Sequence, residues 1–206
     1  MRRRTLLGGL GALGTTGLAG CVGFPAPSWS DDAGPATTVS LDEQDAVPEQ
    51  YGIDIAVEVV RAEFTDESPA AILGTTTNRG GPVKLSIGTG YCSIFNRQRG
   101  GSDEPPGLWL HRPDSHGIER ADGRWVTDLP RDEPRGFPDV GCTMEAYREG
   151  QAVSTPYQVW DDYQTSGHLV PGTYRWEESV TVSDASSDSG SGEESFTWGF
   201  SLRLEA

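Results

Sequence analysis

The C-terminal segment of the chain alternates strictly between large apolar residues and small or polar ones. The apolar parity is occupied by Phe196, Trp198, Phe200, Leu202 and Leu204. Because successive side chains of a strand point to opposite faces, this segment predicts a strand with one wholly apolar face. Such a face must be covered by a second layer, so the segment also predicts a layered β domain.

Shorter stretches of the same kind recur along the chain. We predict strands over residues 53–59, 70–77, 83–87, 91–95, 108–111, 124–127, 157–163 and 173–182. Glycine and proline occur at many of the connections, and no stretch beyond Gln50 offers twelve residues of helical period. This pattern predicts an all-β domain over residues 51–206, built as a β-sandwich, with a partly open barrel as the competing fold.

The first twenty residues have the order of an export signal. Arg3 and Arg4 are followed, after one residue, by two leucines, and this resembles the twin-arginine export motif. A lipobox-like sequence follows, made of Leu18, Ala19, Gly20 and Cys21. The resemblance implies that residues 1–20 are a signal peptide and that Cys21 is lipidated, so that membrane lipid holds the chain through this cysteine. A plain cleaved signal and an uncleaved anchor are the alternatives.

Residues 21–50 predict a linker between the lipid anchor and the folded domain. The segment holds several prolines among serine, threonine and acidic residues and has no apolar period. We therefore expect it to be a flexible tether that lets the domain stand clear of the bilayer.

The chain is strongly acidic. It has 31 acidic and 16 basic residues and a formal net charge of -15, which becomes -18 when residues 1–20 are removed. This balance argues against a nucleic-acid partner, because a surface that neutralises phosphates needs clustered arginine and lysine. Acidic surfaces keep proteins soluble where salt screens charge, so we expect the fold to loosen in dilute buffer.

The acidity and the N-terminal motifs together resemble exported lipoproteins of halophilic archaea. The run from Leu169 to Tyr174, with Pro171 and Gly172 before a late strand, is similar to the closing hairpin of immunoglobulin-like domains. The chain is thus similar to a haloarchaeal twin-arginine-exported lipoprotein with an immunoglobulin-like β-sandwich. An acidic secreted protein from a mesophile is the alternative.

Cys92 and Cys142 are the cysteines that remain after Cys21 is lipidated. Two cysteines in an exported domain predict a disulfide, because the compartment lies outside the reducing cytosol. A reactive thiol is the competing interpretation.

No motif in the chain predicts catalysis or a bound cofactor. The chain has no Gly-x-Ser-x-Gly elbow, phosphate loop or His-Glu-x-x-His sequence. Cys142, Met144 and the histidines lack the spacing of a blue-copper site, and His111, His116 and His168 are only a weak zinc candidate. We therefore expect no catalytic residue, cofactor or metal, and keep a hydrolase as the third hypothesis for function.

The aromatic residues allow two interpretations. A domain of this size has to fill its core with such side chains, but an exposed group of them could stack on a sugar or polymer. Tyr157 and Trp160 have opposite parity on one strand, so we expect at least one of them to face outward unless a bulge intervenes.

The segment over residues 97–140 is the least strand-like part of the domain and holds seven of the twelve arginines that follow residue 20. Arginine and tryptophan supply much of the anchoring energy at interfaces, whereas arginines that pair with nearby acids would only hold the loop shut. We predict a partner-binding face here, for an envelope protein or an acidic polymer, formed by Trp109, His111, Arg120, Arg124, Trp125 and Arg131.

These observations predict a non-catalytic, lipid-anchored domain on the outside of the cell membrane that contacts an envelope protein or ligand. A carbohydrate- or polymer-binding β-sandwich module is the alternative.

Overall fold

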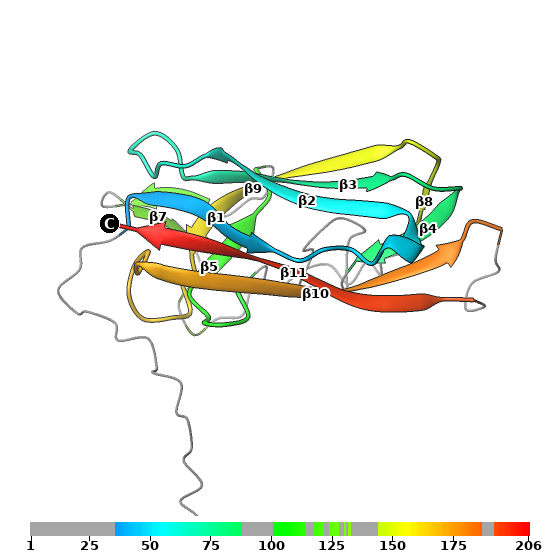
Figure 1. Cartoon of the computed structure of the whole chain (residues 1–206). Coiled ribbons are helices and arrows are strands. Elements are labelled where there is room, and N and C mark those ends of the chain that lie inside the picture. Colours follow the sequence, from blue (N-terminus) through cyan, green and yellow to red (C-terminus); the bar gives the residue numbers. More distant parts are fainter. Residues whose placement is uncertain are drawn as a thin grey trace, which may run out of the picture. The chain divides into compact units, whose positions relative to one another are not determined.

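Two antiparallel sheets form the folded part of the protein in the computed structural model, which describes residues 36–87, 101–113, 118–121, 124–127, 130, 132, 144–186 and 192–206 (Figure 1). The five-stranded sheet has the order β1 (Thr38–Gln44), β11 (Glu194–Glu205), β10 (Gly172–Asp184), β4 (Val83–Ile87) and β8 (Glu145–Tyr147). The four-stranded sheet has the order β2 (Ile53–Arg61), β3 (Ala71–Asn78), β9 (Ala152–Asp161) and β5 (Leu108–His111). The predicted β-sandwich is confirmed, and its finer immunoglobulin-like assignment stays a prediction.

Two further elements lie outside these sheets. A single 3-10 turn, η1 (Glu49–Tyr51), connects β1 to β2. The strands β6 (Ile118–Ala121) and β7 (Arg124–Thr127) pair only with each other in the described chain, as a separate two-stranded hairpin. The hairpin is thus an addition to the sandwich.

The inward faces of the two sheets share one hydrophobic core. The predicted alternation of β11 is confirmed, since its even-numbered residues from Trp198 to Leu204 are at most 2% exposed. Trp176 of β10 stacks on Phe200 of β11 with a centroid distance of 5.1 Å. From the four-stranded sheet, Ile72 and Tyr157 enter the same core. Burying each such side chain stabilises the fold by about 1.5–3 kcal/mol.

The domain begins earlier than the sequence predicted. Residues 21–50 were expected to be a linker, but β1 pairs with the last strand, and Thr38 lies opposite Glu205. Val39 is 2% exposed, and the amide of Ala36 donates to the carbonyl oxygen of Leu169 at 2.7 Å. Residues 36–50 therefore belong to the folded domain, because β11 offers them a partner that lies far away in the sequence.

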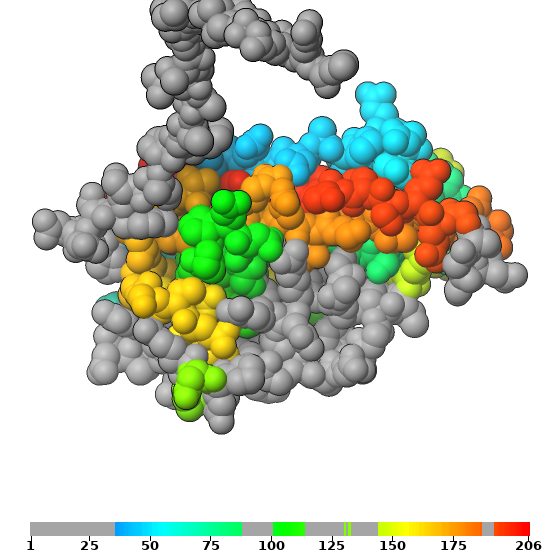
Figure 2. Space-filling model, turned by 90° about the horizontal axis from the view of Figure 1, so that it is seen from below, coloured from blue at the N-terminus to red at the C-terminus, as the bar shows by residue number. Residues whose placement is uncertain are grey.

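Residues 101–107 close one side of the sandwich by bridging the two sheets. The amide of Ser102 donates to Leu108 of β5 at 2.9 Å, and the amide of Asp103 donates to Arg175 of β10 at 2.7 Å. In return, the amide of Arg175 donates to Glu104 at 3.0 Å. In the view from below, this segment (green) lies directly against β10 (orange) (Figure 2). The segment thus forms hydrogen bonds with the backbone of β10 beyond the part of that strand that pairs with β4.

Most predicted strands are confirmed, with shifted ends. The strands over 108–111 and 124–127 have the predicted bounds, whereas β9 begins five residues before the predicted start at Tyr157. The short strands β6 and β8 were not predicted, and the strand expected over 91–95 lies outside the described residues.

Candidate functional site

An aromatic cluster lies on the outer face of β5 and β9, where sequence analysis expected part of a partner-binding face. Trp109 lies directly opposite Trp160. The Trp109 ring stacks on His111 at 5.4 Å between centroids, and His111 meets Trp160 edge-on at 5.5 Å. Tyr163 adds a tilted contact to Trp109 at 5.9 Å. The four rings form a second apolar group outside the main core.

This cluster is buried, which corrects two predicted binding residues. Trp109 is 2% exposed and His111 is 6% exposed, so neither side chain can contact a partner without rearrangement. Trp160 does face away from the main core, as its parity predicted, but it is only 3% exposed. Its indole nitrogen donates to Gln158 at 3.2 Å. The rings of Trp109, His111 and Trp160 thus pack against one another at the edge of the sheet.

The other predicted binding residues belong to the hairpin or lie beyond the described residues. Arg120 pairs with Trp125 across the hairpin, and Arg124 pairs with Ala121. β7 approaches β9, so the hairpin lies near the aromatic cluster. Arg131 lies outside the described residues. The structure thus brings three of the six predicted residues together on one small sheet and leaves two others in a buried cluster nearby.

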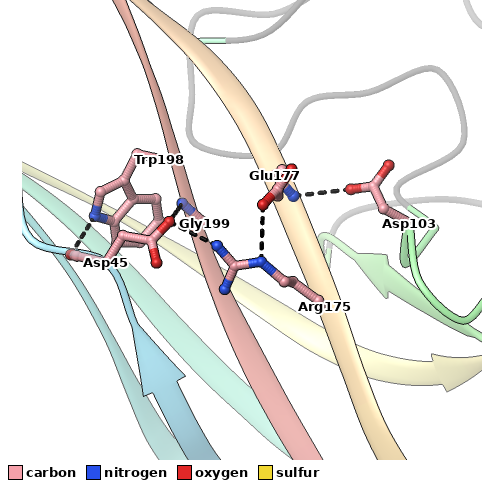
Figure 3. Close-up of polar contacts among 6 residues, drawn as sticks. All are labelled: Asp45, Asp103, Arg175, Glu177, Trp198 and Gly199. Carbon is pink, nitrogen blue, oxygen red and sulfur yellow. Dashed lines mark hydrogen bonds and ion pairs between the residues drawn. The ribbon is translucent and has the colours of Figure 1, made fainter. Parts of the chain in front are cut away.

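A polar network on the outer face of the five-stranded sheet centres on Arg175 (Figure 3). Its guanidinium donates to Asp45 at 2.7 Å and to Glu177 at 2.9 Å. Partial burial opposes the charge of this group, but the hydrogen bonds to Glu177 and Asp45 outweigh it and raise the pKa of Arg175. The arginine therefore joins β10 to the chain just after β1.

Backbone groups complete this network. The Asp45 carboxylate also accepts a hydrogen bond from the amide of Gly199 at 2.9 Å, and its carbonyl oxygen accepts one from the indole of Trp198 at 2.7 Å. The Asp103 carboxylate accepts the amide of Glu177 at 2.8 Å. Apart from the contact between Arg175 and Glu177 within β10, the contacts of the network link β10 and β11 to the chain after β1 or to the bridging segment, so the network stabilises the fold.

Sequence analysis missed this network. Asp45 lay in the predicted linker, and Arg175 had no distinguishing context among the charged residues. The one available signal was the spacing of Arg175 and Glu177, because residues two apart on a strand share a face.

A carboxylate and a histidine meet in the loop after β9. His168 Nδ1 lies 3.8 Å from Asp161 Oδ2, which is an ion-pair distance longer than a hydrogen bond. The other oxygen of Asp161 accepts the amide of Leu169 at 2.8 Å. Leu169 has a φ of 45°, a conformation that costs energy for a side chain of this kind. Asp161 therefore holds a strained loop in place.

The same loop raises the pKa of a neighbouring tyrosine. Burial raises the pKa of Tyr174 to about 12, with a smaller contribution from the negative charge of Asp161. The Tyr174 hydroxyl donates to the carbonyl oxygen of Val170 at 2.7 Å. The last part of the loop between β9 and β10 is thus held by a side chain from each of the two strands.

Within the described residues, no group of three or more histidine, cysteine, aspartate and glutamate side chains is placed to hold a metal ion. His111 lies in β5 and His168 in the loop after β9, and His116 lies outside the described residues. No helix of the described chain is long and apolar enough to span a membrane.

The predicted processing and disulfide residues also lie outside the described residues. These are the export and lipobox residues Arg3, Arg4, Leu18, Ala19, Gly20 and Cys21, and the cysteines Cys92 and Cys142. Their roles stay predictions.

Comparison with known protein families, with curated proteins and with solved structures found no match to this chain.

Proposed function

We propose that this chain is a non-catalytic domain, held by a lipidated Cys21 on the outside of a cell membrane, that contacts another envelope protein or an acidic ligand. The observation that carries this proposal is the β6–β7 hairpin. It places Arg120 opposite Trp125 on one face and Arg124 opposite Ala121 on the other, on an element that belongs to neither main sheet. Such an appendage can serve recognition without disturbing the core of the sandwich.

The start of the domain supports anchoring close to the bilayer. Only residues 22–35 separate Cys21 from Ala36, the first described residue, so the spacer is shorter than the predicted linker. Thr38 lies opposite Glu205, so the start of the domain lies at the end of the sandwich where β11 ends. A membrane-attached domain would therefore keep the opposite end, where Val182 of β10 lies opposite Glu194 of β11, farthest from the lipid.

The charge of the hairpin is compatible with an acidic partner. Residues 118–127 hold two arginines, Arg120 and Arg124, and two acids, Glu119 and Asp122, so the hairpin carries no net charge in a chain with a net charge of -15. An acidic partner therefore meets less repulsion at the hairpin than it would over an acidic surface.

The anchoring part of the proposal is tested by replacing Cys21 with serine. We expect the C21S protein to leave the membrane fraction and to keep its fold by circular dichroism. A C21S protein that stays membrane-bound after a high-salt wash contradicts lipid anchoring.

The binding part is tested by comparing two double variants of equal charge. R120S/R124S changes the hairpin, whereas R148S/R203S removes two positive charges from exposed positions elsewhere. We expect R120S/R124S to lose crosslinking to its partner in intact membranes, with an unchanged melting temperature. Equal loss in both variants would show a general charge effect and would contradict recognition by the hairpin.

We also propose that the protein works in a salty exterior. Its acidic residues repel one another in dilute buffer, and molar salt screens them to within about 3 Å. The melting temperature should therefore rise between dilute buffer and molar salt, and a constant value contradicts this proposal.

A further inference from the structure

The outer face of β3 and β9 carries no ionisable side chain. The outward positions of the two strands hold small or uncharged residues, namely Ala71, Leu73, Thr75, Thr77, Ala152, Ser154, Pro156 and Gln158. Nearly a quarter of the residues in the chain are charged, so eight neutral outward positions on adjacent strands depart from its composition. We call this surface, together with the outward side of β2, the neutral face.

The side chains of the neutral face lie at the surface. Ala152, Ser154 and Pro156 of β9 are exposed, and Val60 of β2 is 54% exposed. Thr75 and Ser154 are hydrogen-bonded to each other at 2.9 Å across the two strands, so their hydroxyls do not stand out as isolated polar groups. The β9 side of the face is therefore accessible, and its β3 side is half-buried.

The few charges on the neutral face lie on its β2 side. Asp54 forms an ion pair with Arg79 at 2.6 Å, which leaves no net charge from that pair. Glu58, opposite Leu73, and Arg61, opposite Ala71, are the other charged residues among the outward positions of β2, β3 and β9, and they contribute one charge of each sign. The charged side chains of the face therefore lie on its β2 side and sum to no net charge.

We propose that the neutral face binds a second copy of this chain, so that the protein forms a symmetric dimer with the four-stranded sheets face to face. Two copies that each carry a net charge of -15 repel one another over most of their surfaces. Asp54 and Glu58 are the only carboxylates at the described outward positions of the neutral face, so two copies can approach there with little repulsion. Sheets packed in this way lie about 10 Å apart with their strands nearly aligned.

This arrangement is compatible with membrane attachment, and that step rests on the proposed function. A two-fold axis parallel to the strands keeps the N-terminal starts of both domains at the same end of the dimer. Both copies could then be anchored in one bilayer without distortion.

The size of the face predicts a weak dimer. Three strands about 4.8 Å apart and eight residues long, at about 3.3 Å per residue, cover roughly 400 Å². Stable complexes usually bury about 800 Å² on each partner. We therefore expect association to depend on the high local concentration that anchoring to one membrane provides.

The test uses the full-length protein in its membrane and a pair of matched cysteine variants. S154C places a thiol at the middle of the neutral face, and S179C places one on an exposed position of β10 on the opposite side of the sandwich. A short bismaleimide should yield a crosslinked dimer of this chain with S154C and only background with S179C. Cys92 and Cys142 are present in both variants, so they contribute equally to the background.

A charge placed on the face provides the second measurement. With A152C as the crosslinking site, S154E should lower the dimer yield by about tenfold, because the symmetric contact brings the two new carboxylates together. S179E adds the same charge to the other sheet and should leave the yield unchanged. Equal effects of S154E and S179E overturn the proposal.

Other outcomes also decide the matter. If the S154C adduct contains a different protein, or if S154C and S179C crosslink equally, the neutral face does not bind a second copy. The same crosslinking on the C21S protein at high concentration separates this proposal from the anchoring proposal. Dimers formed there by S154C support the neutral face even if lipid anchoring proves wrong, and an absence of dimers in both settings overturns it.

Discussion

On the outer face of the five-stranded sheet, arginines and carboxylates join neighbouring strands, whereas the outer face of β3 and β9 carries no ionisable side chain. Arg175 contacts Asp45 and Glu177 on the first sheet, and Arg203 contacts Asp42 at 2.6 Å. The two sheets share one core, so the core does not explain the difference between their outer faces. The charged groups of the first face link segments of the fold, and the uncharged outer face of β3 and β9 is the surface that we propose binds a second copy.

The ion pairs of the two sheets also differ in burial. The side chains of Arg175 and Asp45 are 28% and 31% exposed, whereas those of Arg79 and Asp54 are 67% and 48% exposed. Water weakens an exposed pair, and ordering two long side chains offsets much of its attraction. We therefore expect only the pair on the five-stranded sheet to contribute measurably to stability.

The largest expected effect comes from Gly199, over which the arginine network packs. A β-carbon at this position would collide with the carbonyl oxygen of Trp176 and would lie 2.9 Å from Arg175 Nη2. G199A should therefore lower the free energy of unfolding by about 2–3 kcal/mol, measured by chemical denaturation. G81A is the matched control, because a β-carbon there meets nothing within 4 Å. Equal stability of the two variants would show that the network tolerates displacement.

A smaller effect is expected when the two ion pairs are compared by double-mutant cycles. The cycle with D45A and R175A should give a coupling of about 1–2 kcal/mol, because Asp45 is half-buried and also accepts the amide of Gly199. The cycle with D54A and R79A should give less than about 0.5 kcal/mol. Similar couplings in the two cycles would remove the energetic contrast between the faces.

Sequence reasoning predicted the strands that carry many apolar side chains and missed those that depend on distant partners. The alternation of apolar and polar residues predicted β11 from the sequence alone. β1 offers only Val39 and Leu41 as inward apolar residues, followed by acids, and it is ordered by pairing with β11. No local pattern can show that a partner exists at the other end of the chain.

Pro156 explains the wrong start of β9. A proline usually ends a strand because it has no amide proton to donate. Val159 donates to Ala70 on the β3 side, and alternate residues donate to the same neighbour, so the nitrogen of Pro156 points the other way. β5 pairs only with residues 158–161, which leaves the edge at Pro156 without a strand partner in the described chain. The strand therefore passes through the proline without losing a bond to β3.

The candidate site shows a different limit of the sequence. Trp109 and His111 have the composition of a binding surface, and only their burial shows that they pack against Trp160 instead. Residue type alone predicted that these side chains bind a partner. Whether a side chain is buried depends on contacts with distant parts of the chain, which residue type does not show. Arg120 and Arg124 are the parts of that prediction that the proposed function retains.

Alkaline pH should lower the free energy of unfolding through the five-stranded sheet. Tyr147 and Tyr174, whose pKa values are raised to about 12, both belong to this sheet. Their pKa is about 10 in the unfolded chain, so stability is unaffected below pH 10 and falls as pH rises from 10 to 12. At pH 11, each tyrosine should cost about 1.4 kcal/mol relative to pH 8.

The variant Y174F checks this pH dependence. It should be less stable at pH 8, by about 1 kcal/mol, because it loses the hydrogen bond to Val170. Its loss of stability between pH 8 and pH 11, measured by chemical denaturation, should be about 1.4 kcal/mol smaller than that of the unchanged protein. An identical loss in both proteins would contradict the raised pKa of Tyr174.

The smallest expected effect tests whether the fold itself requires the neutral face to be uncharged. Ala152 is exposed on β9, faces outward opposite Thr77, and has no side-chain hydrogen bond to lose. Alanine and glutamate are both poor strand formers, so A152E should change the free energy of unfolding by no more than about 0.5 kcal/mol. A loss of several times that size would mean that the neutral residues serve the stability of the sheet. If A152E folds normally, the sheet accepts charge at this position, which agrees with the proposal that the uncharged face serves contact with a second copy.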